Sequence, residues 1–106
     1  MADALTEPEF RIAADEAIEL LERALLPLCD EHDVEVERQN GVLQVVFDSP
    51  ASKFVVSPNA PVRQIWVSAM SKSYKLSWAS GARHFELGGE SLDALLTRLV
   101  REQLEL

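Results

Sequence analysis

The chain has 106 residues, of which 47% are hydrophobic, and its formal net charge is −8. This length predicts a single domain over residues 1–106 that buries its own core. The acidic balance argues against a nucleic-acid-binding protein, whose phosphate contacts need clustered Lys and Arg, and the lack of a long apolar run argues against a membrane-spanning one.

The first predicted element is a helix over residues 7–26. Thr6 and Glu9 form a capping box, and Pro8 is acceptable in a first helical turn. Pro27 is expected to end or kink the helix, because proline lacks an amide donor and clashes with the preceding turn. Side chains at the helical period form one broad apolar arc that should face the core: Phe10, Ala14, Ala17, Ile18, Leu21, Ala24, Leu25 and Leu28.

Six short strands are predicted next, separated by turn sequences at hairpin spacing. Asn40-Gly41 is the strongest two-residue hairpin signal in the chain. Beyond the strands, Ser91 can cap a final amphipathic helix that has Asp93 in its first turn. The predicted strands cover residues 34–37, 42–47, 53–57, 63–69, 74–78 and 83–87.

This order of elements predicts an α+β fold. Two amphipathic helices at the chain ends pack naturally on one face of an antiparallel sheet of about five or six strands, as a two-layer sandwich. The other face of the sheet is left uncovered. In the strand over 63–69, alternation directs Ile65 and Val67 toward the helices.

Trp66 is the largest side chain expected on the uncovered face. An exposed aromatic residue is usually incidental surface, but Trp is also a favoured anchor of protein interfaces. Gln64 and Ser68 lie beside it and offer hydrogen bonds. Arg63 and Lys75 are expected to add positive charge near its rim.

Acidic residues are concentrated in the first third of the chain. Residues 1–37 hold 12 of the 18 Asp and Glu residues, against two arginines. Carboxylate oxygens are hard ligands for ferrous iron, manganese, calcium or magnesium, and on a convex surface they bind such ions weakly. A solvated charged face and a docking surface for a basic protein are the other interpretations. We define the acidic ridge as Asp15, Glu16, Glu19, Glu22, Asp30, Glu31, Asp33, Glu35 and Glu37.

Three stretches of the chain resemble the frataxin/CyaY family. They are "NGVLQVVF" at 40–47, "NAPVRQIWVSA" at 59–69 and "SLDALL" at 91–96, and they follow an acidic first helix. The family pattern is roughly Asn-x-Gln-x-Pro-x-x-Gln-Ile/Val-Trp-Leu-Ser/Ala, and it is matched at Pro61, Gln64, Ile65, Trp66 and Ser68. The chain resembles a diverged member, because it departs from the family at Ser57, Asn59, Lys72, Ser73 and Arg83.

The resemblance implies an iron-binding regulator or iron donor in iron–sulfur cluster assembly. By resemblance, the acidic ridge binds ferrous or ferric iron weakly and docks on the cysteine desulfurase. Asn59, Gln64, Trp66 and Ser68 are implied to meet the scaffold protein and the desulfurase. A monomer is expected, with metal-driven oligomerisation as an option. The alternative is a frataxin-like interaction module that binds a basic partner without a metal.

No catalytic residues are predicted, so an enzyme is not expected. The sequence has no Gly-rich phosphate loop, Cys-x-x-Cys pair or His-Glu-x-x-His motif, and weak ferroxidase activity is implied only by the resemblance. Cys29 should be a poor nucleophile, because Asp30 and Glu31 raise the pKa of its thiol. One cysteine allows no internal disulfide and fits a reducing compartment, either bacterial cytoplasm or, after removal of a transit peptide, the mitochondrial matrix.

Overall fold

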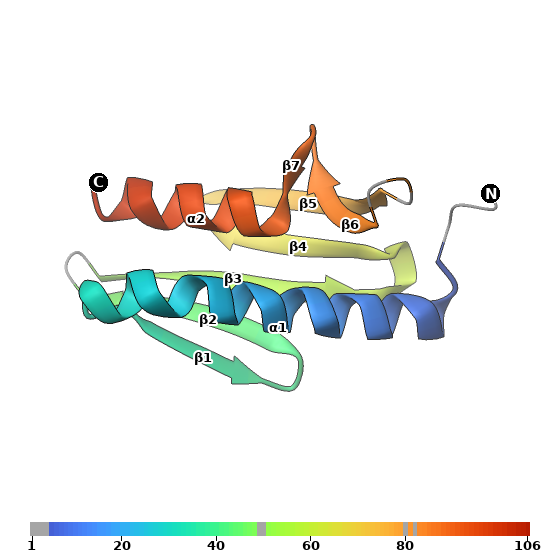
Figure 1. The fold of residues 1–106 in the computed structure, drawn as a ribbon, viewed down its shortest axis with the longest axis horizontal. Coiled ribbons are helices and arrows are strands. Elements are labelled where there is room, and N and C mark those ends of the chain that lie inside the picture. Colours follow the sequence, from blue (N-terminus) through green and yellow to red (C-terminus); the bar gives the residue numbers. More distant parts are fainter. Residues whose placement is uncertain (1–4, 49–50, 80, 82) are drawn as a thin grey trace.

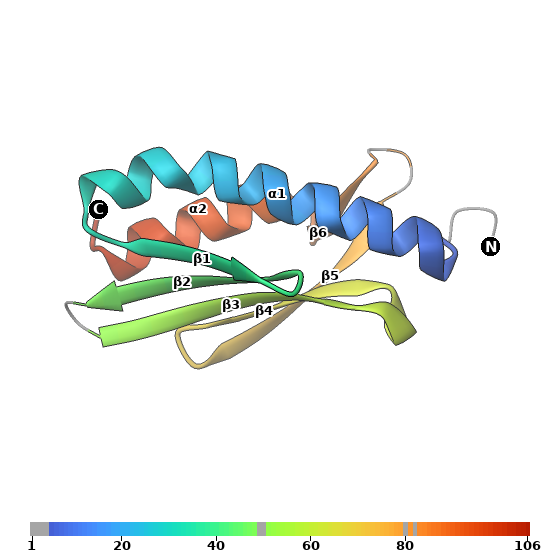
Figure 2. The same ribbon diagram turned by 90° about the horizontal axis from the view of Figure 1, so that it is seen from below.

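The computed structural model describes residues 5–48, 51–79, 81 and 83–106, and within them two helices lie on one face of a seven-stranded antiparallel sheet (Figure 1 and Figure 2). The strands follow one another across the sheet in sequence order. None of the helices in these ranges is long and apolar enough to cross a membrane. The elements are α1 (Glu7–Glu31), β1 (Glu35–Gln39), β2 (Val42–Asp48), β3 (Ala51–Asn59), the 3-10 turn η1 (Ala60–Val62), β4 (Gln64–Ala69), β5 (Lys72–Ala79), β6 (His84–Leu87), β7 (Glu90–Ser91) and α2 (Leu92–Gln103).

The predicted two-layer α+β fold is confirmed. All six predicted strands are present with shifted ends: β1 runs on to Gln39, for example, and β4 begins at Gln64. The two-residue strand β7 was not predicted. It pairs with β6 across a turn at Gly88 and Gly89, both of which have positive φ, a conformation that glycine adopts without steric cost.

The first helix is longer than predicted. It continues through Pro27 to Glu31, so the expected end at residue 26 is wrong. The Pro27 side chain is exposed, whereas Leu25 before it and Cys29 after it are buried in the core. This packing on both sides stabilises the last turn against the helix-breaking effect of proline, since tertiary packing supplies most of the stability of a protein helix.

The core lies between the helices and the sheet, and every buried side chain in the described ranges is apolar. Phe10 of α1 packs edge-on against Phe85 of β6, with ring centroids 5.7 Å apart. Most of the predicted helical arc is buried, but Ala17 and Leu28 are half-buried and Ala24 is exposed, because these residues lie toward the edges of the arc. The sheet contributes Leu43, Val45, Phe47, Phe54, Val56, Ile65, Val67, Ala69, Leu76 and Phe85 to the core.

The two helices differ in length, and this difference shapes the surface. α1 has 25 residues and α2 has 12. α2 lies beside the C-terminal half of α1, while β6 and the start of α2 lie beside its N-terminal half (Figure 1). Within the described ranges, the N-terminal half of α1 therefore has only β6 and the start of α2 along that flank.

Candidate functional site

The acidic ridge follows α1, the loop after it and β1. Asp30 and Glu31 lie in the last turn of α1 and not in a loop, because the helix does not end at residue 26. Asp33 lies in the loop with a φ of 56°. Glu35 and Glu37 alternate with Val36, which packs against the core, so they point to the uncovered face of the sheet.

Arginines neutralise part of the ridge. Arg38 of β1 donates from Nη2 to Asp15 Oδ1 at 2.8 Å and from Nη1 to Glu22 Oε1 at 3.5 Å. Arg23 pairs with Glu19 at 2.7 Å, one helical turn away. Burial works to lower the pKa of Arg38, but the two carboxylates outweigh it and raise that pKa above its ordinary value. Asp15, Glu19 and Glu22 of the ridge are thus held in local ion pairs.

Sequence reasoning missed Arg38, although a signal was present. Arg38 pairs across the ladder with buried Leu43, so it lies on the same side of β1 as Val36. A charged side chain on that side of an edge strand must reach past the core to solvent or to a partner on α1. The Arg38 side chain is 26% exposed and reaches partners on α1, namely Asp15 and Glu22.

The remaining ridge residues have no ion pair within the described part of the chain: Glu16, Asp30, Glu31, Asp33, Glu35 and Glu37. Nor do three or more His, Cys, Asp or Glu side chains come together as a metal site anywhere in the described ranges. Separate exposed carboxylates hold a cation weakly and keep much of its water, since a strong site needs several converging ligands.

Glu16 is separated from the rest of the ridge. It lies about 100° around α1 from Asp15 and lines a groove beside β6 and the start of α2. Asp15 instead faces β1, where it contacts Arg38. The structure therefore connects Asp15 and Glu22 to β1 through Arg38, whereas Glu16 lines the groove.

Trp66 lies on the uncovered face of the sheet, as predicted, and is 36% exposed. Its Nε1 donates to Gln64 Oε1 at 3.0 Å, and Gln64 Nε2 donates to Ser77 Oγ at 3.3 Å. Lys75, its ladder partner on β5, places Nζ 4.8 Å from the ring centroid, a cation–π contact. These contacts fix the orientation of the indole before any partner arrives.

The other predicted contact residues surround the indole. Ser68 is exposed two positions along β4, and Asn59 is half-buried opposite Gln64 at the end of β3. The predicted positive charge at the rim is confirmed for Lys75 but wrong for Arg63.

Arg63 is a structural residue. It ends η1 with a φ of 54°, so it does not belong to β4. Its guanidinium donates to the carbonyl oxygens of Ala60 at 2.7 Å and Leu5 at 3.3 Å. These bonds tie the start of α1 to the turn before β4 and leave the charge away from Trp66.

The strand part of the ridge and the Trp66 surface share one face of the sheet. Ladder pairing aligns Glu37 of β1 with Gln44, Val55 and then Ser68 of β4. Three strand spacings separate Glu37 from Ser68, a distance of about 14 Å. One partner surface of ordinary size would cover both.

Cys29 is a poor nucleophile, as predicted. It is buried in the core beneath the last turn of α1. Burial, with a smaller contribution from Asp30, raises the pKa of its thiol to about 11. Burial is thus the main cause, where the sequence indicated only the neighbouring acids.

Comparison with known proteins agrees with the fold and the sequence motifs. The model of the family described as "Frataxin-like domain" matches residues 3–106. An iron-sulfur cluster assembly protein CyaY from Janthinobacterium sp. (strain Marseille) is 32% identical over 102 residues, which cover 93% of this chain and 90% of that protein. The protein of the same name from Ralstonia nicotianae is 32% identical over 103 residues, covering 95% and 90%.

A solved structure shares the same architecture. Frataxin from Psychromonas ingrahamii superposes with a TM-score of 0.70 at 16% sequence identity, covering 95% of this chain and 93% of that one. At this identity the likeness concerns the fold alone. Taken with the family model over nearly the whole chain, these matches show that the chain belongs to the frataxin/CyaY family.

Proposed function

We propose that this protein is a non-enzymatic factor of iron–sulfur cluster assembly that binds ferrous iron weakly and docks on the cysteine desulfurase and the scaffold protein. The CyaY relatives bear the name iron-sulfur cluster assembly protein. The observation that carries the proposal is the shared face: Glu35 and Glu37 of the ridge point to the same uncovered side of the sheet as Trp66.

Iron would be cargo held by exposed carboxylates. Binding at Asp15 or Glu22 must compete with Arg38, which already occupies both. The carboxylates after Pro27 have no such competitor in the described part of the chain: Asp30, Glu31, Asp33, Glu35 and Glu37. We therefore place the first iron on this second set.

Docking would use the same charges. A basic patch on the desulfurase would be attracted to Glu35 and Glu37, while Trp66 with Gln64 and Ser68 would anchor the contact across the sheet. Iron and the desulfurase then compete for some of the same oxygens. The bacterial relatives support a cytoplasmic setting, the first of the two that the sequence left open.

The alternative is an interaction module without a metal role. It is favoured by one observation: within the described residues, no three potential ligands converge. In this case the ridge would be retained only for its negative field, which attracts a basic partner and accelerates association.

The test is anaerobic cluster assembly by purified desulfurase and scaffold protein, with ferrous iron and cysteine supplied. Adding this protein should change the rate of assembly in either direction. Trp66→Ala and Glu37→Lys should reduce that change. Glu7→Lys, an equal charge reversal in the first turn of α1, at the other end of that helix from Asp30 and Glu31, should leave it intact. A rate that is the same with and without the protein would overturn the proposal.

A further inference from the structure

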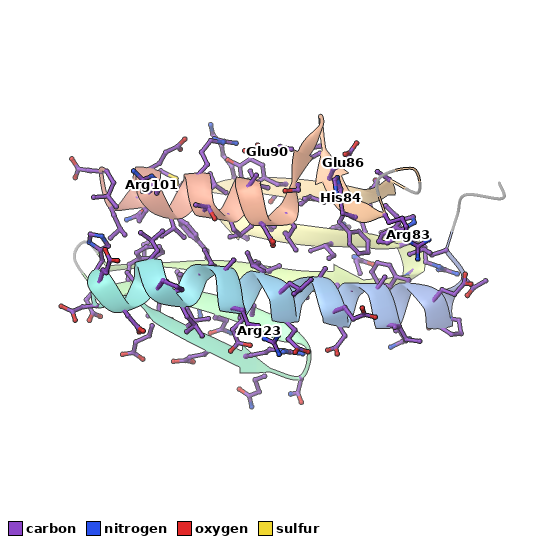
Figure 3. The ribbon with its side chains drawn as sticks, in the orientation of Figure 1. Arg23, Arg83, His84, Glu86, Glu90 and Arg101 are labelled. Atoms are coloured by element: carbon purple, nitrogen blue, oxygen red, sulfur yellow. The ribbon has the colours of Figure 1, made fainter. Side chains whose placement is uncertain are left out.

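A groove with a volume of about 750 Å³ runs along the N-terminal half of α1, on the flank opposite β1. Figure 3 shows Arg83 and His84 of the facing wall beside this half of the helix. The residues that matter here are Ile12, Glu16 and Leu20 of α1, Trp78 of β5, Arg83 before β6, and Asp93 of α2.

The α1 side of the groove carries two large apolar side chains that are open to solvent. Ile12 is 64% exposed and Leu20 is 57% exposed. Ala13 and Ala17 lie beside them, and their short side chains leave space over this part of the helix. Trp78 contributes a half-buried ring, packed edge-on against the core residue Phe85 at 5.1 Å. Large side chains gathered in this way mark an interaction surface more often than isolated ones do.

The fold explains why this surface is uncovered. Beyond its start, α2 lies beside the C-terminal half of α1, so in the part of the chain that the structure describes the N-terminal half of α1 faces only β6 and the start of α2 (Figure 1). A segment laid in the groove would complete the layer that α2 begins. The core is already buried without such a segment, so the groove is open to an additional chain segment.

Charge selects the kind of segment. Three carboxylates line the groove, those of Glu9, Glu16 and Asp93, against one permanent cation, Arg83. Within the described ranges, neither Glu16 nor Asp93 has an ion pair. Although the Asp93 side chain is exposed, nearby protein atoms displace part of its water and raise the pKa of its carboxyl. A cation placed there would stabilise the charged form.

We infer that this groove is a docking site for a segment of a partner protein that presents apolar side chains next to Lys or Arg. The apolar contacts with Ile12, Leu20 and Trp78 supply affinity, and the carboxylates of Glu16 and Asp93 select positive charge. An amphipathic helix is the form that fits, because a helix laid in an apolar groove contacts it through apolar side chains that recur every three or four residues. The site is separate from the ridge on β1 and from Trp66, so it does not depend on the proposed function.

The experiment uses a synthetic amphipathic peptide of Leu and Lys, about 14 residues long, because the groove follows α1 over about 16 Å between Glu9 and Leu20. The peptide is titrated into the full chain at 0.15 M salt while backbone amide and indole signals are recorded. Signals of residues 12–20, Trp78 and 83–93 should shift more than those of residues 30–37. A peptide with Glu in place of Lys should cause no shift.

Two surface variants decide the location. Ile12→Ser combined with Leu20→Ser should weaken peptide binding by at least about 10-fold, because it removes the apolar anchors. Leu26→Ser is the matched control, since Leu26 is 42% exposed on the same helix but outside the groove, and it should leave binding unchanged. Both variants are at exposed positions, and their melting temperatures check that the fold is retained.

Three results would overturn the inference. The first is a dissociation constant for the peptide above about 1 mM, which is too weak for a specific site. The second is a set of shifts confined to the ridge or the sheet, or full affinity in the double variant. The third is a concentration-dependent shift of the groove signals without peptide, which would identify a second copy of this chain as the occupant.

Discussion

The acidic ridge has two parts, one before and one after Pro27, and they differ in what already contacts them. Before Pro27, Asp15 and Glu22 are held by Arg38, and Glu19 by Arg23. After it, the carboxylates from Asp30 to Glu37 have no ion pair in the described ranges. Two runs of acids that look alike in the sequence therefore differ in their contacts: Asp15 and Glu22 of the first connect α1 to β1 through Arg38, and the second has no ion pair in the described ranges.

The largest expected effect concerns the thiol of Cys29, whose reactivity measures how firmly the last turn of α1 is packed. Burial raises the pKa of Cys29 from 9.0 to about 11, so at pH 8 the folded protein should react with iodoacetamide at least about 100-fold more slowly than the unfolded chain. Alkylation rates with and without denaturant measure this ratio. Equal rates would mean that the last turn of α1 opens freely.

The same thiol predicts a pH dependence of stability. Because the folded-state pKa lies above the ordinary value, the contribution of Cys29 is fully present below about pH 9 and is lost as the pH rises from about 9 to about 11. Denaturant unfolding at several pH values should show this loss, and Cys29→Ala should not. A variant that loses stability in parallel with the parent would contradict the assignment.

Charge reversal should separate the two parts of the ridge in docking. Glu35→Lys combined with Glu37→Lys should reduce retention on immobilised desulfurase by about 10-fold or more, because placing like charges against each other at a contact costs several kcal/mol. Glu19→Lys should have a smaller effect, since Arg23 already pairs with that position. Equal losses in both variants would remove the distinction between the parts.

Pro27 itself offers a smaller test. Pro27→Ala should raise the free energy of unfolding by about 1–3 kcal/mol, because alanine restores a helical donor and removes a steric clash. Amides of residues 28–31 should then exchange more slowly, with no change around Asp15. A destabilised variant would show that proline is needed for the path of the chain at this point.

The smallest effect is expected for Arg38→Ala. Its ion pairs lie at a partly exposed edge, so the melting temperature should fall only slightly. The variant should nevertheless make Asp15 and Glu22 respond to ferrous iron at lower concentrations than in the parent. An unchanged response would mean that Arg38 does not compete with the metal.

Much of the fold could be predicted from the sequence because local signals agreed with the global pattern. The capping box at Thr6, the Asn40-Gly41 hairpin and the alternation that exposes Trp66 are all present. Predictions failed where a distant contact outweighs a local preference. Pro27 stays helical because Leu25 before it and Cys29 after it are buried in the core. Arg63 does not belong to the strand, and its side chain donates to backbone carbonyl oxygens.

The candidate site was less predictable for the same reason. The composition indicates a ridge but not the partner of each carboxylate. That partner depends on which face of β1 lies under α1. The register of β1 against β2 decides which face this is. Arg38 and Glu16 are two residues whose contacts could not be predicted from their neighbours in the sequence. Arg38 neutralises acids 16 and 23 residues away, and Glu16 lines the groove beside β6, whereas its neighbour Asp15 faces β1.

We infer that iron binds first to the carboxylates after Pro27, and anaerobic titration with ferrous iron measures which part of the ridge responds first. Amide signals of residues 30–37 should change first, and those near Asp15 and Glu22 only at higher iron. An equal titration with calcium serves as the control for general charge effects. If residues before Pro27 respond at lower iron than residues 30–37, or if no residue from 15 to 37 responds, iron does not bind first to the carboxylates after Pro27.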